Sequence, residues 1–513
     1  MSTKNHVNMP ENAVAVIGAG PAGLVAARYL IARGLVPIIF EASSRLGGQW
    51  NSASAASAIW PGMRTNTSRV MTAFSDLDHT SESAAYPRQE EMLDYLERYA
   101  FTLGLLPHLR LKTRVERLER ADNGWLIRSA EDREVRSEVF RQVVVATGRQ
   151  NLPDLPAVPG LDGFAGALGA VHTAQYNGSE RYRGRKVLVA GCSISALEIA
   201  SDIALGGAAQ VVSSNRRQRY ILPKVIAGVP TDHVMFSRAA VLMESVLPPE
   251  MLAEGLTMKI LKIAGSPDQF GALRPEGNAF VAGISQSQGF LPAVAEGRIA
   301  VKPWMERVDG HTVWFRDGTS VNVDAILFGT GYRLSMPWLS EDIIRTIRLD
   351  GYGADLHDHT FHPDLPGLAF LGLFDLIGPT FPVLELQARW VARCFGGSQS
   401  LPARAAMLVG VERSRATRSG PINLPMHVAA LTFARNAGVE PDLTIWPDLE
   451  RALLFGPLSP ISFRLQGPDL LPHAPAKTKA AAAAFGAIII DDFTPEEEGI
   501  RQLLKLRPVQ TAA

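Results

Sequence analysis

In the first forty residues, two continuous apolar runs are separated by a segment whose apolar residues recur at helical spacing. Residues 14–17 form an unbroken apolar run of the kind found in strands buried on both faces. Apolar residues then recur at helical spacing over 24–31, and a second apolar run occupies 36–40. Strand, helix and strand in this order predict an α/β domain with a parallel sheet.

The same pattern returns later in the chain. Further buried strands are predicted by the apolar runs at 142–146, 186–190, 325–328 and 368–373. A strand that enters a helix over 186–200 repeats the arrangement of residues 14–31, which predicts a second domain of the same kind. Prolines at 153, 156 and 159 follow the strand at 142, and a domain boundary is expected there.

Smaller elements are expected between these strands. An antiparallel sheet is predicted by the segments 115–118, 125–128 and 134–139. A β-meander that returns to the strand at 325 is predicted by the segments 299–301, 313–315 and 321–323. Helices are expected at 88–105, 242–247 and 252–263, the last two separated by Pro248 and Pro249. Thr494 and Glu497 predict a capping box before a short amphipathic helix.

Three glycines form a candidate dinucleotide site after the first strand. Gly18, Gly20 and Gly23 have the spacing G-x-G-x-x-G. The first allows the turn, the second lets the backbone approach a pyrophosphate, and the third lets the helix pack closely. The helix N-terminus then presents N–H groups to the phosphates. Glu41, at the end of the next strand, can accept hydrogen bonds from ribose hydroxyls, so a ribose without a 2′-phosphate is expected.

Two later segments are candidates for the wall of this site. A glycine-rich turn occupies 43–50, and a simple surface loop is its alternative interpretation. Its last residues are Gly48, Gln49 and Trp50. The segment 63–71 places polar side chains, Thr65 and Asn66 among them, before an apolar stretch, which suggests groups directed at a ligand.

The second strand-to-helix turn keeps only its first glycine. Ser193 and Ser195 follow Gly191 at the other two positions, and serine is small enough for close approach. The next strand ends in a segment with Arg216 and Arg217, where a 2′-phosphate would bind; a solvated charge cluster is the alternative. A charged hydrogen bond contributes about 1.5 to 3 kcal/mol, so each arginine would favour NADPH over NADH roughly tenfold to a hundredfold.

Composition narrows the class of protein. Lys and Arg (51) balance Asp and Glu (51) without a basic block, so a small molecule is the expected partner rather than nucleic acid or a membrane. Cys192 and Cys394 are too few for a disulfide framework, and no apolar run has a membrane-spanning length. The first strand begins too early for a secretory signal, so a cytoplasmic location is expected. Histidines 357, 359 and 362 lack a second ligand cluster, and no metal is expected.

Six motifs together resemble the flavin-containing monooxygenases in content and order. They lie at 18–23, 47–50, 64–68, 146–148, 328–332 and 386–390. The resemblance covers roughly residues 13–395. It implies two Rossmann-like dinucleotide-binding domains, with the FAD domain split around an inserted NADPH domain. The implied divisions are FAD-binding at 1–160, NADPH-binding at 161–325, FAD-binding again at 326–465, and a C-terminal tail at 466–513. The oligomeric state stays open, with a homodimer as one candidate.

The family motifs also imply site residues by position. Those added for FAD are Thr65, Thr147, Gly331 and Gln387. A family fingerprint between the domains adds His172 and Tyr176 for NADPH, although two extra residues separate Gly166 from His172. The resemblance further implies that Asn66 is the catalytic side chain, which would hydrogen-bond near the reactive edge of the flavin.

The implied activity is a monooxygenase dependent on NADPH and dioxygen. It would insert one oxygen atom into a soft nucleophile, an amine nitrogen or sulfur, through a flavin 4a-hydroperoxide. The cofactor carries the hard chemistry, and the protein supplies a dry pocket.

Three alternatives stay open. Baeyer–Villiger or N-hydroxylating activity would use the same nucleotide motifs, although Baeyer–Villiger enzymes have tryptophan where Tyr176 stands. A flavin disulfide reductase needs a dithiol that the two cysteines do not offer by their spacing. A non-oxygenating NADPH-dependent flavin reductase or oxidase belongs to a different class.

Overall fold

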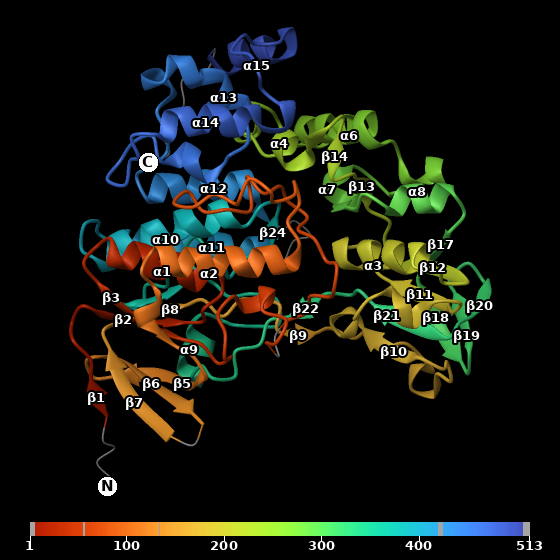
Figure 1. Ribbon diagram of the computed structural model, residues 1–513, viewed down its shortest axis with the longest axis horizontal. Coiled ribbons are helices and arrows are strands. Elements are labelled where there is room, and N and C mark those ends of the chain that lie inside the picture. Colours follow the sequence, from red (N-terminus) through yellow and green to blue (C-terminus); the bar gives the residue numbers. More distant parts are fainter. Residues whose placement is uncertain (1–5, 55–56, 133, 419–423, 506–513) are drawn as a thin grey trace.

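The computed structural model contains two parallel sheets, each with its own strand-to-helix turn (Figure 1). The structure describes residues 6–54, 57–132, 134–418 and 424–505. The first sheet has the order β23-β8-β2-β3-β4 and is parallel throughout. Its strands are β2 (Ala13–Ile17), β3 (Val36–Phe40), β4 (Leu109–Arg110), β8 (Gln142–Val145) and β23 (Leu368–Phe370). The α/β fold class is therefore confirmed.

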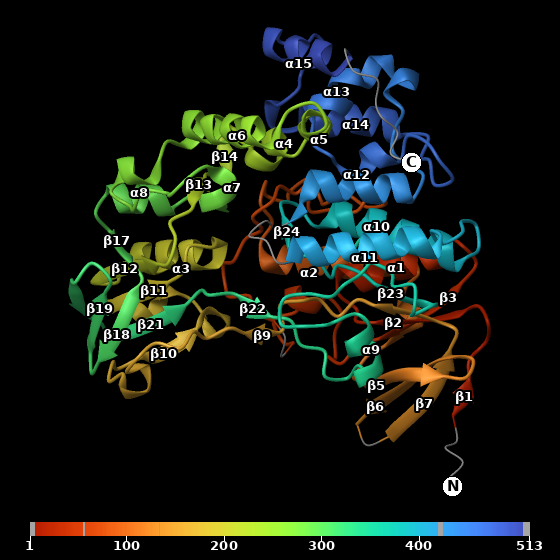
Figure 2. The same ribbon diagram turned by 180° about the vertical axis from the view of Figure 1, so that it is seen from behind.

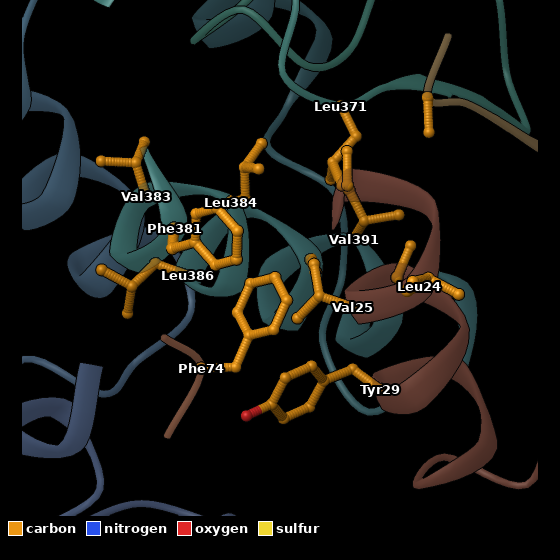
Figure 3. Close-up of a cluster of buried hydrophobic side chains, with 14 of the residues drawn as sticks. Leu24, Val25, Tyr29, Phe74, Leu371, Phe381, Val383, Leu384, Leu386 and Val391 are labelled. Carbon is orange, nitrogen blue, oxygen red and sulfur yellow. The ribbon is translucent and has the colours of Figure 1, made fainter. Parts of the chain in front are cut away.

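Helices α1 (Pro21–Ile31) and α10 (Phe381–Phe395) pack together over one face of this sheet. Figure 3 shows Leu24 and Val25 of α1 in one buried cluster with Phe381 and Val391 of α10. These side chains are almost fully removed from water, and burying an apolar side chain of this size contributes about 1.5 to 3 kcal/mol. The core thereby holds the N-terminus of α1 at the carboxyl ends of the strands, where ligands bind in such sheets.

A small sheet of the predicted antiparallel kind lies beside the first one. Its strands are β1 (Val7–Asn8), β5 (Thr113–Ala121), β6 (Gly124–Glu131) and β7 (Glu134–Phe140). Strands β5, β6 and β7 pair antiparallel, as predicted, and β1 adds a short parallel edge.

The second sheet has the order β10-β21-β11-β12-β17. Its strands are β10 (Gly169–His172), β11 (Lys186–Ala190), β12 (Gln210–Asn215), β17 (Ile299–Pro303) and β21 (Ala325–Phe328), and α3 (Ile194–Leu205) follows β11. The prediction that residues 299–301 begin a meander was wrong, because β17 pairs in parallel with β12. Pro303, which has no N–H to donate, ends β17, and the meander starts afterwards. It consists of β18 (Met305–Asp309), β19 (Thr312–Phe315) and β20 (Ser320–Asn322).

The two crossings between the sheets lie side by side. Strand β9 (Leu152–Pro153) pairs antiparallel with β22 (Tyr332–Arg333). Next to this pair, the Asn151 side chain donates to the carbonyl of Ser335 (2.7 Å) and accepts from its N–H (2.8 Å). The chain thus leaves and re-enters the first sheet through one joined connection.

The segment after β12 extends to the C-terminal helices, as both views show (Figures 1 and 2). Its helices are α4 (Thr231–Met235), α5 (Arg238–Glu244), α6 (Pro249–Ala264), α7 (Ala279–Ala282) and α8 (Phe290–Ala295). The C-terminal helices are α12 (Met426–Asn436), α13 (Glu450–Phe455), α14 (Ala474–Ala483) and α15 (Pro495–Lys505). Pro249 is the first residue of α6, where a missing N–H costs nothing.

The remaining elements lie outside the two parallel sheets, and the first of them, the helix Gln89–Thr102, packs Met92 and Tyr95 into the core of the first sheet. They are α2 (Gln89–Thr102), α9 (Glu341–Thr346), α11 (Arg404–Arg418), β13 (Tyr220–Leu222), β14 (Val225–Ile226), β15 (Val229–Pro230), β16 (Ile284–Gln286), β24 (Leu376–Ile377) and β25 (Leu424–Pro425). The predicted capping box of α15 is present, because Thr494 N–H donates to Glu497 (2.7 Å) and Thr494 Oγ1 accepts from Glu497 N–H (3.2 Å). None of the described helices is long and apolar enough to cross a membrane.

A buried ionic network ties the C-terminal part to the first sheet. The Arg464 side chain is 2% exposed and donates to Tyr29 and to Ser75 Oγ (3.1 Å). Its guanidinium also lies 3.4 Å from a carboxylate oxygen of Asp76 and 3.7 Å from one of Glu385. The positive charge therefore offsets two buried carboxylates, one before α2 and one on α10.

Candidate cofactor and active site

The first glycine turn is too tight for side chains at two of its positions. Gly18 has a φ of +107°, and a Cβ there would lie 2.6 Å from the carbonyl oxygen of Ala146. A Cβ on Gly23 would lie 1.9 Å from the Gly18 carbonyl oxygen. The turn therefore needs both glycines to bring α1 onto the strand ends.

A second glycine-rich loop closes against this turn. A Cβ on Gly48 would lie 2.8 Å from the Cα of Gly20, and Gly47 N–H donates to the Ala19 carbonyl (2.9 Å). Gly20 caps α1 without a side-chain hydrogen bond to the helix, which leaves the first N–H groups available to an anion. The two loops form one backbone cradle.

Glu41 lies at the edge of the cradle. Glu41 is 9% exposed, and its carboxylate accepts from Ala19 N–H (2.9 Å) and from the N–H (2.8 Å) and hydroxyl (2.6 Å) of Ser43. These bonds fix the carboxylate at the carboxyl end of β3, the position at which ribose hydroxyls are bound in this fold.

Two buried donors beside the cradle have no partner in the described part of the chain. They are the hydroxyl of Thr147 and the indole N–H of Trp50. Buried polar groups are normally hydrogen-bonded, so unpaired donors at this position fit a site made for a polar ligand. Together with the glycine backbone, they fit a dinucleotide such as FAD.

The second turn repeats the first one with serines. A Cβ on Gly191 (φ +128°) would lie 2.4 Å from the Gly329 carbonyl oxygen, so the first position again needs glycine. Ser193 precedes α3 without capping it by its side chain, and Ser195 is exposed on the first turn of the helix. Small side chains are thus accommodated where the first site has glycine.

A cleft lies between the part of the molecule built on the first sheet, called the first half below, and the part formed by the second sheet and the segment after β12, called the second half. A cavity of about 160 Å³ is lined by Trp60 and Asn66 from the first half and by Ser195, Glu198 and Lys224 from the second. The sequence reasoning missed Lys224, which is 7% exposed and pairs with Glu198 at 2.8 Å. A lysine after a short apolar run gives no local signal, and only the fold brings it to α3.

The comparisons with known proteins decide the family. The family described as flavin-binding monooxygenase-like matches residues 11–476. The chain belongs to this family. It is therefore a flavoprotein oxidoreductase with FAD and NADPH as cofactors, as the resemblance implied. The flavin-binding monooxygenase is 29% identical over 480 residues to the dimethylaniline monooxygenase [N-oxide-forming] 2 of Oryctolagus cuniculus, covering 89% of each chain. It is 28% identical to the flavin-containing monooxygenase 2 of Homo sapiens, again covering 89% of each.

Solved structures agree on the fold. The S-allyl-L-cysteine S-oxygenase of Allium sativum aligns with a TM-score of 0.62 at 24% identity, over 92% of this chain and 98% of that one. A cyclohexanone-bound cyclohexanone monooxygenase aligns with a TM-score of 0.64 at 18% identity, over 85% and 98%. Both likenesses concern the architecture of two dinucleotide-binding domains.

Several expected cofactor ligands of the monooxygenase already have partners within the protein. Gln387 is fully buried, accepts from Gly372 N–H (2.9 Å) and donates to Thr360 Oγ1 (2.7 Å). The Thr65 hydroxyl donates to the Thr67 carbonyl (2.8 Å). These bonds favour a role in shaping the loops around FAD, and direct contact with FAD stays a prediction for both side chains.

The two fingerprint residues are engaged in the same way. His172 Nδ1 accepts from Ala174 N–H (3.0 Å), so its Nε2 carries the proton and donates to the Gly331 carbonyl (2.9 Å). The Tyr176 hydroxyl donates to Asp202, next to the cleft. The bond from His172 to Gly331 thereby ties the end of β10 to the crossing that leads into β22. NADPH contact by His172 and Tyr176 stays a prediction. Gln49 and Gly331 are exposed.

The arginine segment lies at the carboxyl end of β12, as expected. Arg216 and Arg217 are exposed, and the guanidinium of Arg216 stacks 4.5 Å from the ring centroid of Trp304. No carboxylate of the described residues pairs with either arginine. Asn215, which the sequence reasoning missed, precedes them with a buried Oδ1 that has no partner in the described chain. Across the described ranges, no three His, Cys, Asp or Glu side chains are placed to hold a metal ion.

Proposed function

We propose that this monooxygenase transfers one atom of dioxygen to a soft nucleophile, the nitrogen of a tertiary amine or the sulfur of a thioether. The reaction converts NADPH, a proton, dioxygen and the acceptor into NADP⁺, water and the oxygenated acceptor. The single observation that carries the proposal is the cavity in which Asn66 of the first half meets Ser195 of the second. A relative with 29% identity is named for N-oxide formation from dimethylaniline, which supports the amine class.

The cradle residues and the cleft residues have different tasks in this proposal. When bound, FAD supplies the redox chemistry between NADPH and dioxygen. The backbone at Gly18, Gly20 and Gly48 would hold its pyrophosphate, with Glu41 on the ribose. In the cleft, the Asn66 amide can both donate and accept a hydrogen bond, and Trp60 covers one side of the cavity.

Exclusion of water from the loaded cleft would matter as much as its polar groups. A covered cavity prevents the reactive oxygen species from escaping as hydrogen peroxide. In this proposal the cleft needs no acid–base pair from the protein. Of its charged lining residues, Lys224 forms an ion pair with Glu198.

We also propose the division into a split FAD domain, an inserted NADPH domain and a C-terminal tail. Strand β21 pairs within the second sheet, which supports a boundary after residue 328 rather than after 325. For the location we propose the cytoplasm, which the two free cysteines support.

A substrate comparison under ¹⁸O₂ tests the proposed function. The FAD-loaded protein is given NADPH with N,N-dimethylaniline, a dialkyl thioether or cyclohexanone, and products are analysed by mass spectrometry. We expect one labelled oxygen in the N-oxide or sulfoxide for each NADPH consumed. A labelled lactone alone would indicate Baeyer–Villiger chemistry instead. Stoichiometric hydrogen peroxide with every acceptor would indicate a reductase or oxidase.

A further inference from the structure

The loop that carries Asn66 is held from both halves of the protein. From its own half, Thr65 N–H donates to the Pro87 carbonyl (2.9 Å), and the Thr72 hydroxyl donates to the Ser68 carbonyl (2.8 Å). From the other half, Oδ2 of Asp232 accepts from Ser68 N–H at 2.6 Å. Asp232 is the second residue of α4, 164 positions further along the chain.

Asp232 is an unusual group at this position. It is 3% exposed, its Oδ1 has no hydrogen-bond partner among the described residues, and no Lys or Arg of those residues pairs with it. The titratable groups that face it are His233, whose Nε2 lies 4.0 Å from Oδ1, and Tyr86. A buried carboxylate without a cation lowers the stability of the folded state, so we expect this side chain to have a functional role.

The same segment also contacts the cleft directly. His233 Nε2 lies 3.2 Å from the Ser68 hydroxyl. The Tyr86 hydroxyl donates to the carbonyl of Lys224, whose side chain lines the cavity. Residues 224–233 therefore connect the cavity wall of the second half with the backbone two residues after Asn66.

We propose that Asp232 is a positioning residue for Asn66, holding the 63–71 loop from the second half of the molecule through Ser68 N–H. The inference rests on the proposed function, in which Asn66 acts in the cleft. An ionised carboxylate accepts a stronger hydrogen bond than a neutral amide or water does, which explains why a charge is retained here. When Asp232 is removed, Ser68 N–H loses its acceptor on α4, and Asn66 samples positions outside the cavity wall.

Graded variants of the FAD-loaded protein test this role. Asp232→Asn keeps a neutral acceptor and Asp232→Ala keeps none, so the hydrogen peroxide released per NADPH should rise in the order wild type, Asn, Ala. A lost charged hydrogen bond shifts a positional equilibrium about tenfold or more, and we expect a rise of that order for Asp232→Ala. Asp355→Asn is the matched control, because Asp355 is also buried but pairs with Arg415 and Arg418 away from the cleft. It should lower the melting temperature without raising peroxide.

Two further measurements separate positioning from mere stability. Amide hydrogen exchange of residues 63–71 should be faster in Asp232→Ala and unchanged in Asp355→Asn, whether or not an acceptor is known. Burial raises the pKa of Asp232 to about 6, lowers that of His233 to about 4, and raises that of Tyr86. Peroxide release from the wild type should therefore increase as the pH falls through about 6, and Asp232→Asn should lack this step.

The outcomes distinguish the two proposals. If the wild type oxygenates no acceptor, the proposed function fails, and hydrogen exchange still tests the hold of Asp232 on the loop. The positioning role is overturned if the wild type couples NADPH oxidation to oxygenation and Asp232→Ala matches it both in hydrogen peroxide released per NADPH and in amide hydrogen exchange of residues 63–71.

Discussion

Replacing Arg216 or Arg217 tests the assignment of the second site to NADPH. The guanidinium of Arg216 is already stacked on Trp304 at 4.5 Å, so little side-chain freedom is lost when a phosphate binds. A hydrogen bond from a charged group contributes about 1.5 to 3 kcal/mol. Each change to alanine should therefore lower the preference for NADPH over NADH by about 10- to 100-fold.

The assay is the ratio of kcat/KM for NADPH to that for NADH, measured at low and at moderate salt. The loss should appear in the KM for NADPH with little change in kcat, because the 2′-phosphate is bound equally in ground and transition states. It should shrink as salt rises, since both side chains are exposed. Arg307→Ala is the matched control: that guanidinium also stacks 4.5 Å from a tryptophan ring, Trp314, but on the β18–β19 hairpin. A preference that stays within twofold of wild type in both Arg216→Ala and Arg217→Ala would refute the reasoning.

Three further predictions concern FAD retention and stability. Gly23→Ala places a Cβ 1.9 Å from the Gly18 carbonyl oxygen, so we expect a lower flavin-to-protein absorbance ratio and a loss of about 1 to 3 kcal/mol; full flavin content would contradict this. Arg464→Met leaves Glu385 without its buried cation and should cost about 3 to 5 kcal/mol in denaturant unfolding; an unchanged midpoint would argue against the network. Burial raises the pKa of Asp232 from its usual 3.8 to about 6, so the folded state binds the proton more tightly than the unfolded state and loses stability as the pH rises through this interval. The loss is at most about 3 kcal/mol. Between pH 4 and 7, calorimetry should show the stability of Asp232→Asn rising relative to that of the wild type. Parallel curves of stability against pH for the two proteins would contradict the pKa shift.

Most strands of the two sheets and both turns could be predicted from the sequence because their causes are local, whereas the short strands β4 and β10 were not predicted. A buried strand needs an apolar run, and the turns at Gly18 and Gly191 need a residue without a Cβ. The error at residues 299–301 has a local cause as well. A strand of three to five apolar residues carries no signal for the neighbour with which it pairs, so β17 could be placed in the meander or beside β12.

The contacts around Asn66 could not be predicted, because they join distant parts of the chain. Asp232 and Lys224 look like ordinary polar residues in a stretch without a motif, and only the folded chain buries them against Ser68 and Glu198. The same limit applies to Gln387, where the family motif indicated importance but not the bonds to Gly372 and Thr360 that its side chain makes.

The most direct test of the central claim is the coupling of NADPH oxidation to oxygen transfer in Asn66→Ala. The FAD-loaded variant is compared with wild type and with Asn322→Ala, an exposed asparagine on β20, in the presence of N,N-dimethylaniline. We predict about one N-oxide per NADPH in the wild type and in Asn322→Ala, and in Asn66→Ala continued NADPH oxidation with hydrogen peroxide in place of N-oxide. An Asn66→Ala variant that still forms one N-oxide per NADPH would contradict the account of the cleft.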